Sequence, residues 1–340
     1  MQIHRINATL AGAFLGIALV AGAASFDAAA AKELKLASFT PAPHHLNKHV
    51  FGPLAKKVAA ATGGSLTIKL FVGGSLGKGP IQQYKRVVER VADMTFGVHA
   101  YTATLFPRTL IAGRPGLGNT SDEVTRRLWR VYDKYFKGEY KRVKVLGIWS
   151  NWPAVLISRT KPVRTLADVK GMKLRVTSTS DDPQVKAWGA VPQHMGMTDV
   201  YNAMSNGIID AVYIAPSVLY RPWNFSEPAK FVTEGMTGPS NLFFLLMNKQ
   251  SWDGLSKPHQ TALDKLTGAG FSVETARSWQ GADIRALKAA KGGKNVEFIK
   301  LTPAQAAAFD KVSMAAVKKD LAALEKKGIN ANEIYQAMLK

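Results

Sequence analysis

Residues 171–214 decide the fold. They begin G-M-K-L-R-V at Gly171–Val176 and end N-G-I-I-D-A-V-Y-I at Asn206–Ile214. The pattern predicts, in order, a short strand at Met172–Val176, a helical turn at Gln184–Trp188, a loop at Gly189–Pro192, a helix at Asp199–Ser205 and a second strand at Ile208–Ile214. Elsewhere the pattern predicts a strand at 94–98, a strongly apolar strand at 241–247, a long helical region at 258–290 and an amphipathic helix at 331–339.

Arg175 is the candidate binding residue of this stretch. It alternates with apolar positions in the first strand and shares a face with Lys173, two positions earlier. A guanidinium group is a planar fork of donors that matches a carboxylate. Arg175 therefore indicates a site for an organic acid if its face of the strand borders a cleft. A solvated cation on an exposed strand is the alternative that the pattern alone leaves open.

Several motifs in and around this stretch stand in the same register. They are Pro162-Val163, A-D-V-K-G-M-K-L-R-V at 167–176, G-A-V-P at 189–192, Met195, D-V-Y-N-A-M at 199–204 and G-I-I-D-A at 207–211. Together they resemble the substrate-binding proteins of tripartite ATP-independent periplasmic (TRAP) transporters. That family's pattern runs P-V…D-L-K-G-(L/M)-K-(I/L)-R-V and then G-A-x-P-x-x-M-x-x-x-E-V-Y-x-A-L-x-x-G-V-V-D-G. The likeness extends from about Leu34 to residues 252–255 and thins over the C-terminal helices.

The resemblance implies a two-lobed, type II-like periplasmic binding protein. Each lobe is expected to be a mostly parallel α/β sheet flanked by helices, with a long hinge-spanning helix. Such a protein captures a small organic anion without a cofactor and delivers it to a small and a large membrane subunit, and Arg175 stands at the position of the carboxylate clamp. We expect residues 32–152 plus 239–275 to form the first lobe, and residues 153–238 plus 276–340 to form the second.

Residues 1–31 have the features of a secretory signal peptide. Arg5 precedes an uncharged run rich in Ala, Leu, Gly and Val, and Ala29 and Ala31 offer a small-residue cleavage site. The run is short and dilute for a membrane anchor, which is the alternative. The chain has no cysteine, and therefore no disulfide and no lipid-attachment site. We expect a periplasmic protein that is not inserted in the membrane.

The formal net charge is +21, from 45 Lys and Arg against 24 Asp and Glu. A basic chain raises the possibility of nucleic-acid binding. The cations are scattered, however, and often stand beside acids, as in K-K-D at 318–320, and no nucleic-acid motif is present. We therefore expect a solvated basic surface and no nucleic-acid partner.

Two other motifs compete with a binding function. Gly73-Gly74-Ser75-Leu76-Gly77 fits the G-x-S-x-G elbow of serine hydrolases, which makes a secreted hydrolase the main alternative, although Gly79-Pro80 interrupts the approach to the next helix. His44, His45 and His49 include a pair four residues apart, a spacing that can bind a metal, but no cysteine or nearby carboxylate completes the set. We expect neither catalysis nor a metal.

The remaining candidate ligand contacts follow from the family's pattern and from the departures from it. The family often carries a second arginine near Val155 and an asparagine where Ile214 stands, so two polar contacts are absent. The lining candidates are Trp149, Trp152, Met197, Tyr213 and Ile214. The candidates for restoring polar contacts are His99 and Arg114, and His44 is placed to reach a cleft from the end of the first strand.

One strong cation among apolar and aromatic residues predicts a monocarboxylate ligand with an apolar or aromatic body. A dicarboxylate or sugar acid bound by the same fold is the alternative.

Overall fold

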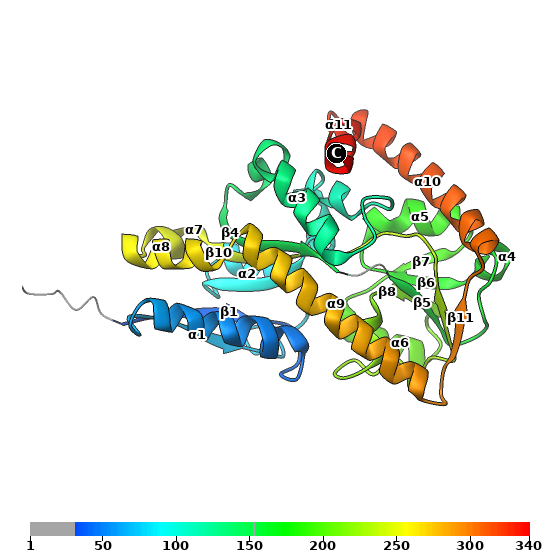
Figure 1. Ribbon diagram of the computed structural model, residues 1–340, viewed down its shortest axis with the longest axis horizontal. Coiled ribbons are helices and arrows are strands. Elements are labelled where there is room, and N and C mark those ends of the chain that lie inside the picture. Colours follow the sequence, from blue (N-terminus) through cyan, green and yellow to red (C-terminus); the bar gives the residue numbers. More distant parts are fainter. Residues whose placement is uncertain (1–30, 152–153) are drawn as a thin grey trace, which may run out of the picture. The chain divides into compact units, whose positions relative to one another are not determined.

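The computed structural model describes residues 31–151 and 154–340, which form one compact unit. The predicted signal peptide at 1–31 lies outside the described residues except for Ala31. Two sheets, each covered by helices, make up the two lobes (Figure 1). Within the described part of the chain, no helix is both long enough and apolar enough to cross a bilayer.

The first lobe is built on a five-stranded sheet in the order β2-β1-β3-β10-β4. Its strands are β1 (Lys32–Ala37), β2 (Leu66–Phe71), β3 (Met94–Val98), β4 (Val143–Ser150) and β10 (Leu242–Asn248). Its helices are η1 (Asn47–Phe51), α1 (Gly52–Ala61), α2 (Gln83–Val88), η2 (His99–Leu105), η3 (Thr109–Gly113), α3 (Ser121–Tyr135), η4 (Lys137–Tyr140), α7 (Lys249–Asp253) and α8 (Lys257–Leu266).

The second lobe is built on a six-stranded sheet in the order β11-β9-β5-β8-β6-β7. Its strands are β5 (Val155–Ser158), β6 (Lys173–Val176), β7 (Val191–His194), β8 (Ala211–Ile214), β9 (Phe231–Glu234) and β11 (Glu297–Lys300). Its helices are α4 (Leu166–Val169), η5 (Thr179–Asp181), α5 (Asp182–Ala187), α6 (Met197–Ser205), η6 (Pro216–Leu219) and α10 (Pro303–Glu325).

Both sheets are mostly parallel, as the sequence indicated, with one reversed strand in each. In the first sheet, β10 pairs antiparallel with both β3 and β4. In the second sheet, β5 pairs antiparallel with both β8 and β9. The reversal of these two strands follows from the connectivity. β5 and β10 each come directly after a crossing between the lobes, and each enters its sheet in the direction opposite to the strands of the βαβ units.

β10 forms the centre of the first lobe. All seven of its residues are buried, which agrees with the apolar strand expected at 241–247. Phe243, Leu245 and Met247 face one core cluster, which contains α1 and α8. Leu242, Phe244 and Leu246 face the other, which contains α2, α3 and α11 (Ala331–Leu339). Because successive side chains of a strand point to opposite faces of the sheet, β10 contributes to both cores.

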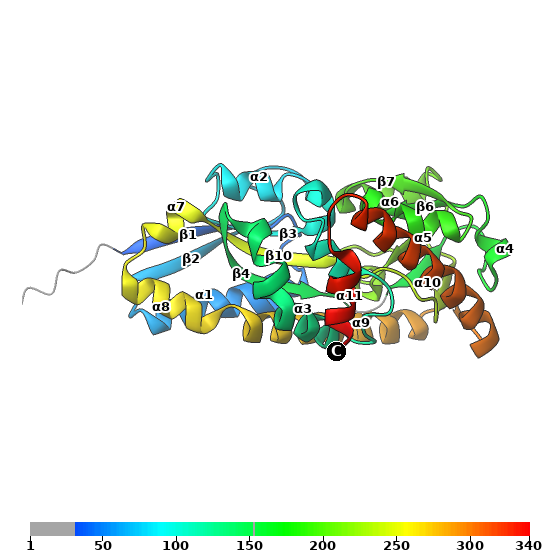
Figure 2. The same cartoon turned by 90° about the horizontal axis from the view of Figure 1, so that it is seen from above.

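Helix α9 (Ala269–Gly292) connects the lobes, because it packs on β4 and α3 in the first and on η6 in the second (Figure 1). The sequence predicted one helical region at 258–290. The structure has a break at Thr267-Gly268, where Gly268 adopts φ 84° and its N–H donates to the carbonyl of Leu146. Figure 2 shows α9 running from the first sheet to the second as a single helix.

The C-terminal helix α11 lies with the first lobe, although the sequence assigned 276–340 to the second. Ile334, Tyr335 and Met338 enter the first-lobe core, and the hydroxyl of Tyr335 donates to the carbonyl of Pro115 at 2.7 Å. The preceding α10 packs on α5 of the second lobe. We therefore propose a division in which the lobes interleave as expected, but with α11 returned to the first lobe.

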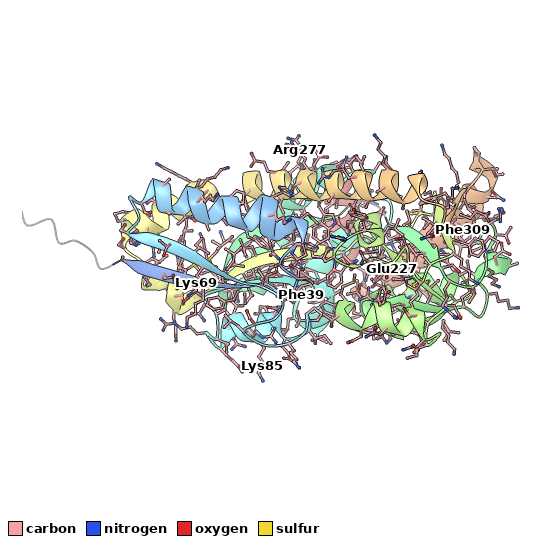
Figure 3. The ribbon with its side chains drawn as sticks, turned by 90° about the horizontal axis from the view of Figure 1, so that it is seen from below. Phe39, Lys69, Lys85, Glu227, Arg277 and Phe309 are labelled. Atoms are coloured by element: carbon pink, nitrogen blue, oxygen red, sulfur yellow. The ribbon has the colours of Figure 1, made fainter. Side chains whose placement is uncertain are left out.

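Basic side chains are spread over the surface rather than gathered on one face. Lys85 and Arg277 lie on opposite sides of the molecule in Figure 3. Many cations pair with acids, among them Lys85 with Glu89 at 3.7 Å and Arg277 with Asp122 at 3.2 Å.

Candidate functional site

A small cavity lies where the two lobes meet. It is bordered by residues that end or follow four strands: Thr40 after β1, Tyr101 after β3, Thr177 after β6 and Ser217 after β8. Loops at the carboxyl ends of strands are where open α/β sheets bind ligands.

Among the described residues that line this cavity, Arg175 is the only charged one. It lies in β6 between β7 and β8, and its side chain is 2% exposed. Its Nε and Nη2 donate to the carbonyl of Met195 at 3.2 and 2.9 Å, which fixes the plane of the guanidinium group. Nη1 donates only a long bond, 3.4 Å, to the hydroxyl of Thr177.

No described carboxylate lies within ion-pairing distance, 4.0 Å, of Arg175. The acid that senses its charge is Asp181, a half-buried carboxyl whose pKa is raised by desolvation and lowered in smaller measure by Arg114 and Arg175. Burying a cation without a bound partner costs several kcal/mol. An anion bound at Arg175 would offset this cost.

Three neutral polar groups surround the guanidinium. The hydroxyl oxygen of Tyr101 accepts from Arg175 Nη2 at 3.1 Å, and the hydroxyl of Thr177 donates to Asn241 Oδ1 at 3.0 Å. The backbone N–H of Asn241 donates in turn to Asn151 Oδ1 at 3.1 Å. In the described part of the chain, the side-chain nitrogens of Asn151 and Asn241 have no partner, so both are available to a ligand.

Aromatic rings form the apolar wall. Phe39, Phe96 and Phe243 line the cavity, and Phe96 stacks on Phe39 and on Phe243 with ring centroids 5.2 and 5.9 Å apart. Figure 3 shows Phe39 on the side of the first lobe that faces the second. Trp279 of α9 packs on Phe243 at 4.2 Å. Parallel rings of this kind present a flat surface to a planar ligand.

His44 supplies a neutral donor among these rings. Its Nδ1 accepts from the backbone N–H of Leu46 at 3.3 Å, so the proton of the neutral ring lies on Nε2. Burial lowers the pKa of His44 to about 3, which keeps the ring neutral. Its ring meets those of Trp223 and Trp279 edge-on, and none of these contacts is shared with Arg175.

Four of the residues singled out from the sequence come together here: Arg175, Met197, Ile214 and His44. Trp149 lies directly behind the wall, fully buried, and stacks on Phe96 and Phe243. Trp152 lies outside the described residues.

Three other candidates lie away from the cavity. His99 is buried in the first lobe between Tyr140 Oη, at 2.7 Å, and the carbonyl of Leu242, at 3.2 Å. Tyr213 is buried in the second lobe, where its hydroxyl donates to the carbonyl of Met236. Arg114 bridges the lobes elsewhere, through Asp320 Oδ2 at 2.8 Å and the carbonyl of Ser180 at 2.8 Å.

Sequence reasoning missed several lining residues, namely Tyr101, Asn151, Thr177, Trp223, Asn241 and Trp279. A signal for two of them was present, because Asn151 and Asn241 are amides placed at the ends of strongly apolar strands. Tyr101 carries no such signal, because η2 has an irregular backbone. Trp279 carries none either, because helical periodicity does not show which face of α9 borders the space between the lobes.

Of the residues in the two competing motifs, His44 alone lines the cavity among the described residues. Ser75 lies in a turn after β2, eight residues before α2 begins, and its hydroxyl bonds to no described residue. His45 packs its ring on His44 and Trp279 with centroids 4.4 and 4.9 Å apart, and no group of metal-binding side chains is found among the described residues.

A two-lobed α/β fold that encloses an unpaired cation between its lobes defines the class of solute-binding proteins. The family model described as bacterial extracellular solute-binding protein, family 7 (DctP), matches residues 36–323. This chain therefore belongs to that family of transport proteins.

Known relatives agree with this assignment. A TRAP periplasmic solute-binding protein from Bordetella bronchiseptica, solved with bound (R)- and (S)-mandelate, is 27% identical, with 91% of this chain and 98% of that chain covered and a TM-score of 0.82. A TRAP solute-binding protein from Rhodoferax ferrireducens T118, solved with copurified benzoate, is 23% identical. The match covers 91% of this chain and 96% of that chain, with a TM-score of 0.86. The C4-dicarboxylate-binding periplasmic protein DctP of Rhodobacter capsulatus is 29% identical, but the match spans about half of either chain, 52%.

Proposed function

We propose that this protein binds an aromatic monocarboxylate in the periplasm and delivers it to the membrane subunits of a TRAP transporter. The observation that carries the proposal is Arg175, a buried guanidinium group without an acidic partner in the described structure, in a cavity walled by aromatic rings. The carboxylate pairs with Arg175, and the ligand's ring lies against Phe96 and Phe243. The mandelate and benzoate of the two solved relatives have this chemistry.

A dicarboxylate is the second candidate, favoured by the unused amide nitrogens of Asn151 and Asn241 and by the Rhodobacter capsulatus relative. These amides are neutral, and no second cation lines the cavity among the described residues. A second buried carboxylate would therefore keep much of its desolvation cost, so the aromatic acid is preferred.

Titration calorimetry of the purified protein tests the choice, with benzoate, (R)-mandelate, succinate and glucuronate as ligands. We expect benzoate or mandelate to bind at least ten times more tightly than succinate or glucuronate. Tighter binding of succinate or glucuronate would overturn the proposal. We propose no catalysis at Ser75, and hydrolysis of 4-nitrophenyl acetate that is lost in Ser75→Ala would contradict this.

A further inference from the structure

Tyr101 connects the two lobes at the binding cavity. It belongs to η2, which follows β3 of the first lobe, and its hydroxyl oxygen meets two second-lobe donors. These are Arg175 Nη2 at 3.1 Å and the backbone N–H of Met197 at 2.9 Å. The donors belong to β6 and to the first turn of α6, so a single oxygen joins three elements across the cleft.

The hydrogen-bond inventory of this hydroxyl leaves its proton unused. A phenolic oxygen offers two lone pairs and one O–H. Both lone pairs of Tyr101 face N–H donors, and no acceptor for its O–H is found in the parts of the chain that the structure describes. Because Tyr101 lines the cavity, the remaining direction in which the proton can be donated includes the space beside Arg175.

Tyr101 also stands between two hollows. One is the cavity described above. The other is an outer hollow that opens to solvent, lined by Tyr101, Thr177, His194 and Met195 among others. Tyr101 and Thr177 border both, whereas Arg175 borders the inner one alone. Separating Tyr101 from Arg175 and Met197 would therefore join the inner cavity to the outer hollow.

We propose that Tyr101 is the closure sensor of this protein: its phenolic proton binds the carboxylate held by Arg175, and the same hydroxyl shuts the cavity. This inference rests on the proposed function, since it requires a carboxylate at Arg175. In the empty protein, the closed arrangement engages both lone pairs of this hydroxyl and leaves its O–H without a described protein acceptor, which opposes closure. The bound anion supplies that acceptor, so the ligand itself favours the closed state.

The variant Tyr101→Phe tests this role, because it keeps the ring and removes only the hydroxyl. The bond to a charged acceptor and the two cross-lobe bonds are lost, so we expect benzoate or mandelate to bind about 10- to 100-fold more weakly. Most of the change should be in the dissociation rate, since the variant fails to hold the closed state. Trp223 and Trp279 line the cavity, so stopped-flow tryptophan fluorescence can follow release.

Small-angle scattering measures closure itself, through the radius of gyration. Loss of a ligand contact that played no part in closure would leave the ligand-induced change in this radius intact. Saturating ligand should reduce the radius of gyration of the wild-type protein, and should reduce that of Tyr101→Phe much less. Tyr220→Phe is the matched control, because Tyr220 is 56% exposed and lies outside the cavity. We expect this control to behave as the wild type in both measurements.

The outcomes separate this inference from the proposed function. If the wild type binds none of the aromatic acids, the proposed function fails and the sensor role fails with it. If the wild type binds, but Tyr101→Phe retains affinity and dissociation rate within about threefold, Tyr101 is no sensor while the proposed function stands. Weaker binding with undiminished compaction would also overturn the sensor role, because closure would then not depend on the hydroxyl.

Discussion

Replacing Arg175 by methionine should abolish tight binding of aromatic acids while leaving the fold intact. Arg175→Met conserves the length of the side chain and removes the charge from a position that is 2% exposed. The unoccupied protein has no described carboxylate paired with Arg175, so no ion pair is broken by the change. Only the liganded state loses a charge pair.

The size of the effect follows from the burial of the pair. Removing one partner of a buried, hydrogen-bonded charge pair costs roughly 2–5 kcal/mol. This range corresponds to a dissociation constant raised about 30-fold to several thousand-fold. Arg175→Lys keeps the charge but not the planar fork, and it also loses the paired bonds to Met195, so we expect an intermediate loss.

Titration calorimetry with benzoate and mandelate, at one pH and ionic strength, measures this directly. Thermal unfolding of each variant without ligand checks that the fold persists. An affinity of Arg175→Met within about threefold of the wild type would refute the reasoning, because it would mean that the carboxylate is held elsewhere.

Three further predictions concern stability. Gly97→Ala should destabilise the protein by about 1–3 kcal/mol in urea unfolding, because a methyl group there meets the Phe244 ring, whereas Gly138→Ala, in open space, should change little. Arg114→Met should cost about 2–4 kcal/mol by leaving Asp320 as an unpaired, mostly buried carboxylate, and an unchanged urea midpoint would contradict this. Burial lowers the pKa values of His44 and His99 to about 3, so the unfolded chain takes up their protons first as pH falls below about 6.5. The free energy of unfolding should therefore be highest above that pH and should fall below it by about 1.4 kcal/mol per pH unit for each histidine. A urea midpoint that does not change between pH 7 and 5 would refute this prediction.

The sequence predicted most elements of the fold because their patterns are local. The strand at 94–98 and the helix at 331–339 agree with β3 and α11 at both ends. β7 was missed because Gly189 and Pro192 indicated a loop. Proline is tolerated there since β7 is the edge strand of its sheet, where one side of the backbone needs no partner.

The site was harder to predict than the fold, because it depends on which faces of two lobes meet. Periodicity marked Arg175 as one of two cations on a strand face, and the family's pattern identified it as the binding residue. Neither could show that Trp149 packs behind the cavity wall while Trp279, about 130 residues later, borders the cavity. Tyr101 lies in an irregular turn, where no periodic rule assigns a direction to a side chain.

The hydrogen bond from the backbone N–H of Leu46 to His44 has a consequence for binding outside the cytoplasm, where the pH varies. By fixing the proton of His44 on Nε2, and with burial lowering the pKa of that ring to about 3, it holds one donor in place while the medium changes. A protein exported from the cell cannot rely on a buffered cytoplasm. Its discrimination between ligands should stay the same from neutral to mildly acid pH, and should change only when the ligand itself loses its charge.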